Sequence, residues 1–143
     1  MMIYISSSNR KASSEELRAL LQFCIHSSKY VILTSYESKD GDFAESLKAC
    51  GLAKHDHRTD GSLVTTPAVC DLCWFDIQAV DLQVMETDFY SSVQVGEYEF
   101  EDIAFADAEG RIWFRSCSHE RFWDMELTED QYERFCRTGM INV

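Results

Sequence analysis

Two histidines and two cysteines near the middle of the chain have the types and spacing of metal ligands. His55 and His57 form an H-x-H pair, and Cys70 and Cys73 follow as C-x-x-C after twelve intervening residues. Zinc binds imidazoles and thiolates tetrahedrally, and a C-x-x-C pair can supply two thiolates from one turn. One hypothesis for the chain, kept as the alternative, is therefore a small zinc-binding domain or an enzyme that uses these four residues.

The local sequence argues against this use of the cysteines. Cys70 and Cys73 lie in the segment AVCDLCWFDI, which has the pattern of a strand. Residues i and i+3 of a strand face opposite sides, so the two thiolates would not reach one ion. A redox dithiol would need a helix N-terminus instead. The preferred interpretation is that the six cysteines are reduced, mostly buried thiols, since the N-terminus lacks the pattern of a signal peptide and a cytoplasmic location is expected.

No sequence motif indicates an enzyme. There is no nucleophile elbow, Walker loop, Rossmann fingerprint or H-E-x-x-H. His55 or His57 could act as a general base, but nothing in the sequence pairs either with a reacting group. The hydroxyl-rich segment Ile5–Ser13 resembles the phosphate loop of flavodoxin-like proteins without its glycine, and a plain loop ending in a Ser13 helix cap is preferred. We expect neither enzymatic activity nor a cofactor.

The charge of the chain is unevenly distributed. The formal net charge is −12, and the 52 residues from Thr59 to Gly110 contain twelve acidic residues but no lysine or arginine. The other 91 residues contain 13 acidic and 13 basic residues, so the whole imbalance lies in this central segment. Such a potential repels nucleic acids and anionic membranes and attracts basic proteins.

The segment GEYEFE, residues 96–101, predicts how part of this charge is arranged. Glu97, Glu99 and Glu101 share one parity and the aromatic residues Tyr98 and Phe100 the other, so on a strand the aromatics can enter the core while the carboxylates face outward. From residue 102 onward the apolar residues change parity. A turn or bulge at that point would restore an inward-facing set.

The remaining elements predict an α+β fold in a single domain spanning residues 1–143. The expected sheet is mixed but mostly antiparallel, with about three helices packed on it and a possible N-terminal βαβ unit. The predicted elements are a strand over 2–6, a helix after a capping box at Ser13 and Glu16, a strand over 30–36, a helix over 42–51, several strands between 63 and 117 (DLQVMET among them), a turn at 107–110 and a helix over 128–139.

Together, these features favour a binding protein. In size and acidity the chain resembles bacterial toxin-immunity proteins, which implies a basic partner such as a nuclease toxin; a phage-type inhibitor of a nucleic-acid enzyme would rely on the same physics. The contact surface would be an acidic face of the sheet formed by the strands of the central segment. Its carboxylates would steer the partner and bind its arginines and lysines, with aromatics such as Trp74 as anchors. The predicted contact residues are Asp76, Tyr90, Glu97, Tyr98, Glu99, Glu101, Asp102 and Asp107.

Overall fold

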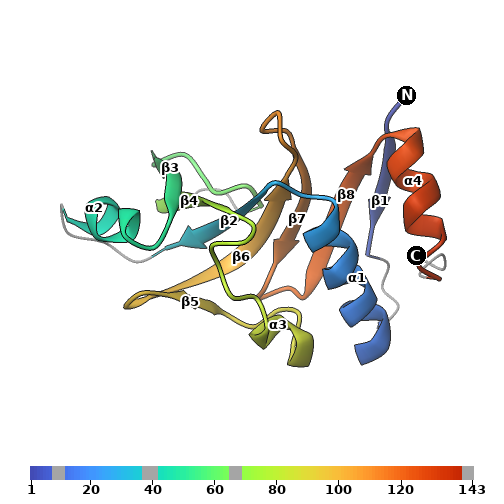
Figure 1. Ribbon diagram of the computed structural model, residues 1–143, viewed down its shortest axis with the longest axis horizontal. Coiled ribbons are helices and arrows are strands. Elements are labelled where there is room, and N and C mark those ends of the chain that lie inside the picture. The colour runs from blue at the N-terminus through green and yellow to red at the C-terminus, as the bar shows by residue number, and fades with distance from the viewer. Residues whose placement is uncertain (8–11, 37–41, 65–68, 140–143) are drawn as a thin grey trace.

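The computed structural model describes residues 1–7, 12–36, 42–64 and 69–139, which form a large antiparallel sheet and four helices (Figure 1). The strands are β1 (Ile3–Ser6), β2 (Tyr30–Ser35), β3 (Leu52–Arg58), β4 (Cys70–Asp76), β5 (Val93–Val95), β6 (Tyr98–Ala106), β7 (Ile112–Cys117) and β8 (Phe122–Leu127). The helices are α1 (Ser14–His26), α2 (Phe43–Lys48), α3 (Val84–Thr87) and α4 (Glu129–Cys136).

The sheet has the strand order β1-β8-β7-β6-β2-β4-β3, and β5 pairs with the first part of β6 beside this path. Every strand pairing among the described residues is antiparallel. The α+β class is therefore confirmed. The expectation of a mixed sheet is wrong, and the described residues form four helices rather than about three.

The N-terminal strand–helix–strand segment does not form a parallel pair. β1 and β2 run in the same direction, because four antiparallel steps separate them, but β8, β7 and β6 lie between them. These three strands follow one another along the chain and pair as a meander, which fills the space that a neighbouring parallel strand would occupy. The predicted βαβ unit is thus split by three inserted strands.

One face of the sheet carries the main core. α1 and α4 begin with the predicted capping boxes at Ser13 and Thr128, and Figure 1 shows both helices near the β7–β8–β1 end of the sheet. Phe23 of α1 joins them to the sheet, since its ring centroid lies 5.6 Å from that of Trp113 and 5.3 Å from that of Phe135. The buried aromatic residues therefore fix both helices to one face.

The other face carries a smaller buried cluster. Ile32 and Ala104 are buried at its centre, and Leu63, from the segment that connects β3 to β4, packs against them. In the same segment the Ser62 hydroxyl lies 3.0 Å from the hydroxyl oxygen of Tyr36, which ties the segment to the end of β2. The connecting segment thus helps to cover this face.

Two elements differ from their predictions. Residues 52–58, for which no element was predicted, form edge strand β3, where one open side tolerates polar residues. The segment DLQVMET, expected as a strand, contains the single helical turn α3, which follows an Asp81 carboxylate that accepts a hydrogen bond from the Gln83 backbone at 2.9 Å. Short apolar runs do not distinguish a strand from a buried helical turn by periodicity alone.

The cysteines and helices agree with the remaining expectations. All six cysteines are free thiols, four of them buried. Burial raises the pKa of the Cys24 thiol well above its usual value, so the buried thiol stays protonated and behaves as a small apolar side chain. Within the described part of the chain, none of the helices is both long enough and apolar enough to cross a bilayer.

Candidate functional site

The acidic segment predicted from GEYEFE begins with a tight hairpin between β5 and β6. Val95 pairs with Tyr98, so Gly96 and Glu97 form a two-residue loop, and Gly96 has a φ of +59°. Only the first loop residue has a positive φ, which is the geometry of a type II′ turn and favours glycine there. The turn places Glu97 and Glu99 at the surface, while Phe100 enters the core with 1% exposure.

The predicted bulge lies at Asp102. Along β2 the pairing advances two residues, from Ile32 to Thr34, while along β6 it advances three, from Ala104 to Glu101. β6 therefore contains one extra residue, and Asp102 adopts the left-handed conformation with a φ of +54°. Beyond it Ile103 and Phe105 are buried in the main core. The prediction that a bulge restores the inward-facing set is confirmed.

The Asp102 carboxylate stabilises this bulge and is not a surface group. It accepts hydrogen bonds from the Ser118 backbone N–H at 2.7 Å and from the Tyr36 hydroxyl, while the Asp102 N–H donates to the Ser118 hydroxyl at 3.1 Å. Asp102 is 5% exposed. Its prediction as a contact residue is therefore wrong, because the carboxylate is needed to satisfy donors inside the fold.

Beside the bulge lies a cleft of about 120 Å³, here called the β2–β6 cleft. It is lined by residues from the end of β2, from the residue before β5 and from the first part of β6: Thr34, Ser35, Tyr36, Ser92, Glu99, Phe100 and Glu101. Glu99 is exposed and Glu101 is half-buried. The hydroxyl of Ser35, whose residue is 2% exposed, has no hydrogen-bond partner among the described residues.

Two further contacts shape this cleft. The Thr34 hydroxyl donates to the Asp102 carbonyl at 3.4 Å, which links the cleft wall to the bulge. The Glu101 carboxylate lies 4.0 Å from Nε2 of His119, whose side chain is 87% exposed. The serine, threonine and tyrosine that end the apolar strand YVILTSY were not predicted as site residues. The sequence feature that could have identified these residues is the change from aliphatic to hydroxyl side chains at the end of the strand.

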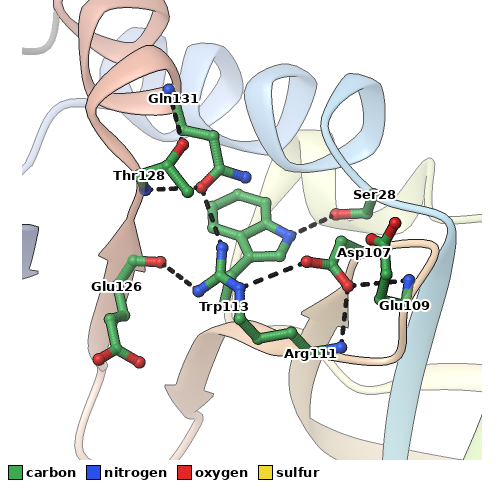
Figure 2. Close-up of polar contacts among 8 residues, drawn as sticks. All are labelled: Ser28, Asp107, Glu109, Arg111, Trp113, Glu126, Thr128 and Gln131. Carbon is green, nitrogen blue, oxygen red and sulfur yellow. Dashed lines mark hydrogen bonds and ion pairs between the residues drawn. The ribbon is translucent and has the colours of Figure 1, made fainter. Parts of the chain in front are cut away.

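Two of the predicted contact residues are bound to cations within the protein. The Asp76 carboxylate pairs with the Lys29 ammonium at 2.6 Å, and this hydrogen bond lowers the pKa of Asp76 below its usual value. Figure 2 shows Asp107 bound to Arg111, which also donates to the Glu126 carbonyl at 2.9 Å. Asp107 therefore belongs to an internal network.

The predicted aromatic contacts are only partly accessible. Tyr98 packs edge-on against Phe43, with ring centroids 4.8 Å apart. The Arg121 guanidinium lies over the Tyr90 ring at 4.9 Å, and burial raises the pKa of Tyr90 to about 12. Trp74 is 7% exposed. These rings support the fold, and Trp74 offers no surface large enough to anchor a partner.

The acidic residues of the central segment do not gather on one face. Six of the twelve lie within 4.0 Å of a lysine, arginine or histidine from the flanking parts of the chain, namely Asp60, Asp71, Asp76, Asp88, Glu101 and Asp107. Glu97 and Glu99 form no ion pair with the residues that the structure describes. The expectation of one continuous acidic face is thus corrected to a smaller surface at the start of β6.

The histidines and cysteines of the zinc hypothesis do not assemble. Cys73 belongs to the main core and Cys70 to the cluster on the opposite face, as expected for positions i and i+3 of a strand. In the described part of the chain no three histidine, cysteine or acidic side chains lie where they could hold a metal ion. The zinc site built from His55, His57, Cys70 and Cys73 is therefore wrong.

The two histidines have a different role, because both contact one buried carboxylate. Asp71 Oδ1 lies 2.7 Å from His55 Nε2 and 3.1 Å from His57 Nδ1, so it accepts a hydrogen from each ring. This joins β3 to β4 and fixes the hydrogen positions of both rings. Of the segment that resembled a phosphate loop, residues 8–11 lie outside the described residues, while Ser7 bonds to the backbone of Trp123 and Ser13 caps α1.

Comparison with protein-family models, with curated proteins and with solved structures found no match to this chain.

Proposed function

We propose that this chain is a protein-binding inhibitor that neutralises a basic protein, in the manner of an immunity protein or antitoxin that blocks a nuclease toxin. The contact surface is the set of Glu97, Glu99 and Glu101, called here the β6 carboxylates, together with the adjoining β2–β6 cleft. This surface is smaller than the set of residues that the sequence suggested, since Asp76, Asp102 and Asp107 serve the fold instead.

The observation that carries the proposal is the exposure of Glu97 and Glu99 on the β5–β6 hairpin. Neither has an ion-pair partner among the described residues, although arginine, lysine or histidine side chains lie beside six other acidic residues of the same segment. Residues two apart on a strand are separated by about 7 Å, so the three carboxylates repel one another in the free protein. A cationic partner relieves that repulsion on binding.

The overall charge supports the same conclusion. At a net charge of −12 the chain attracts a basic protein over distances of about one Debye length, roughly 8 Å at physiological salt. Opposite potentials raise association rates towards about 10⁸ M⁻¹s⁻¹ at low salt. A nuclease displays a positive surface for phosphates, so carboxylates held on a hairpin can occupy that surface or one beside it.

The test is capture of the partner from the source cell by the immobilised full chain. The variant Glu97→Gln/Glu99→Gln/Glu101→Gln removes the β6 carboxylates. The matched control Glu86→Gln/Glu109→Gln/Glu120→Gln removes the same charge from exposed residues elsewhere. We expect the native chain and the control variant to retain a basic protein. We expect the first variant to bind that protein more weakly and to inhibit it less.

Association kinetics with the captured protein provide the second measurement. The association rate should fall steeply as salt increases, because steering depends on unscreened charge. Equal capture by both triple variants, or an association rate that does not change with salt, would show that the proposed function is wrong.

A further inference from the structure

The two edges of the sheet differ in how they are protected against further strands. The strand order places β3 at one edge and β1 at the other. β3 carries three charged side chains, Lys54, Asp56 and Arg58, and its register with β4 shifts between Leu52 and Lys54. Charged side chains and bulges are devices that keep natural edge strands from pairing with other chains. The β3 edge is therefore protected.

The β1 edge has none of these protections. Residues 1–7 contain no charged side chain and no proline, and β1 pairs with β8 in regular register from Ile3 to Ser6. Three of the five large apolar residues that are exposed in the described part of the chain lie here, with exposed fractions of 92% for Met1, 42% for Met2 and 61% for Tyr4. Exposed apolar side chains on an unprotected edge indicate a surface for another chain.

The backbone of β1 also has hydrogen-bonding groups to offer. The Ser7 N–H donates to the Trp123 carbonyl beside β8 at 2.8 Å. Successive residues of a strand direct their N–H and C=O groups to opposite sides, so those of Tyr4 and Ser6 point away from β8. None of the described residues bonds to these groups. A strand placed beside β1 would therefore meet two donors and two acceptors.

Charge indicates which strand can lie there. At a net charge of −12, two copies of the chain repel each other over most of their surface, but β1 itself is uncharged. Glu126 of β8 lies opposite Tyr4. In two copies joined at β1, the two Glu126 positions are three strand spacings apart, about 14 Å, which exceeds the Debye length of about 8 Å at physiological salt. A second copy of β1 thus fits this edge without close like charges.

We propose that β1 is a dimerisation edge, at which two copies of this chain pair their β1 strands antiparallel about a twofold axis. Tyr4 and Ser6 of each copy supply the backbone hydrogen bonds, and the exposed side chains of Met2 and Tyr4 pack across the axis. The proposal goes beyond the proposed function and does not depend on it. Figure 1 shows β1 and the β5–β6 hairpin at opposite ends of the molecule, so the dimer leaves both sets of β6 carboxylates accessible.

Sedimentation equilibrium of the full chain at low and high salt tests the dimer. We expect twice the chain mass, with a dissociation constant of about 10 µM at high salt, because a four-residue edge buries less than a standard interface. The affinity should rise severalfold from about 0.05 M to about 0.5 M salt, since screening reduces the repulsion between two acidic chains. Association with a basic partner should respond to salt in the opposite direction. Amide hydrogen exchange of Tyr4 and Ser6 should slow as the chain concentration rises.

Variants of the full chain then locate the contact. Ser6→Pro removes a donor that points away from β8 and none of the bonds to β8, so it should weaken the dimer at least tenfold while β1 stays paired. Tyr4→Lys should have an effect of similar size, because a charge on the edge opposes strand pairing. Ala53→Lys is the matched control: it adds the same charge to an exposed residue of β3 and should change the dissociation constant less than about twofold.

Three results would overturn the proposal. These are a single-chain mass at about 1 mM protein in high salt, a dimer that weakens as salt rises, and a dimer that both β1 variants leave intact. If the Tyr4 and Ser6 amides become protected only when a different protein is added, the edge binds that protein and self-pairing is wrong. Capture of a basic partner depends on the β6 carboxylates instead, so either proposal can fail while the other stands.

Discussion

Both ends of β6 carry acidic residues, but the carboxylates at one end are bound within the protein and those at the other end are exposed. At the C-terminal end Asp107 is held by the Arg111 side chain at 3.3 Å and by the backbone N–H groups of Glu109 and Arg111. At the N-terminal end Glu97 and Glu99 are exposed on a hairpin and form no ion pair with described residues. Acidic side chains therefore have a structural role at the C-terminal end of β6, whereas at the N-terminal end their charge is available to bind a partner.

The surroundings of each end explain the difference. Figure 2 shows Arg111 between Asp107, the Glu126 carbonyl and Gln131, whose side-chain oxygen also accepts from the Thr128 N–H. That network connects the β6–β7 turn to β8 and the start of α4. Among the described residues, neither Glu97 nor Glu99 on the β5–β6 hairpin has an ion pair with a lysine, arginine or histidine, so these two carboxylates depend on solvent or on a partner. The bulge at Asp102 lies between these two ends of β6.

The largest expected effect on stability comes from replacing Asp102, the residue at the β6 bulge. Asp102→Ala should lower the free energy of unfolding by about 3 kcal/mol, because it leaves the part-buried Ser118 N–H without its acceptor and places alanine in the left-handed conformation. Denaturant unfolding measures this change. Asp102→Asn, which tolerates that conformation and keeps one acceptor, should lose less than half as much; an alanine variant within about 0.5 kcal/mol of the native chain would contradict the structural role.

The second expected effect tests the C-terminal end of β6. Arg111→Ala should lower the free energy of unfolding by about 2 kcal/mol, since Arg111 donates to Asp107, to the Glu126 carbonyl and to Gln131. Arg134→Ala, on the exposed side of α4, is the matched control and should change stability by less than about 0.5 kcal/mol. Equal losses in the two variants would mean that the network adds nothing beyond ordinary surface charge.

The bulge in β6 and the starts of two helices could be predicted from the sequence, because these features depend on local patterns. The alternation of GEYEFE and its reversal after Glu101 predicted the bulge, and two capping boxes predicted the starts of α1 and α4. Each of these signals involves residues within a few positions of one another, where backbone geometry alone fixes which side chains meet.

The long-range pairings could not be predicted in the same way. Nothing near Asp76 in the sequence indicates Lys29, 47 residues earlier, and nothing near Asp102 indicates Tyr36. Those contacts depend on the strand order, which places β2 between β6 and β4. The sequence therefore suggested one acidic face, although the fold brings Lys29 to Asp76 and Arg121 to Asp88 and places histidines beside Asp71 and Glu101.

The third prediction has the opposite sign to the first two. Ser35→Ala should raise the free energy of unfolding by about 1 kcal/mol, because it removes a buried hydroxyl that has no partner among the described residues. Thermal and denaturant unfolding of the free chain measure the gain, with Ser116→Ala as the control: its hydroxyl donates to the Ile103 carbonyl at 2.6 Å, so that variant should lose stability. A loss in Ser35→Ala would show that the hydroxyl is already satisfied within the fold.

The smallest expected effect concerns the N-terminal end of β6. Glu99→Gln should raise the free energy of unfolding by a few tenths of a kcal/mol at low salt, because it relieves repulsion from Glu97 and Glu101. The gain should vanish at about 1 M salt, where the Debye length is only about 3 Å. Glu86→Gln, an exposed change on α3 outside the β6 carboxylates, controls for net charge. If Glu99→Gln instead lost more than about 1 kcal/mol at both salt concentrations, this carboxylate would be structural like those of Asp102 and Asp107, and the two ends of β6 would no longer differ.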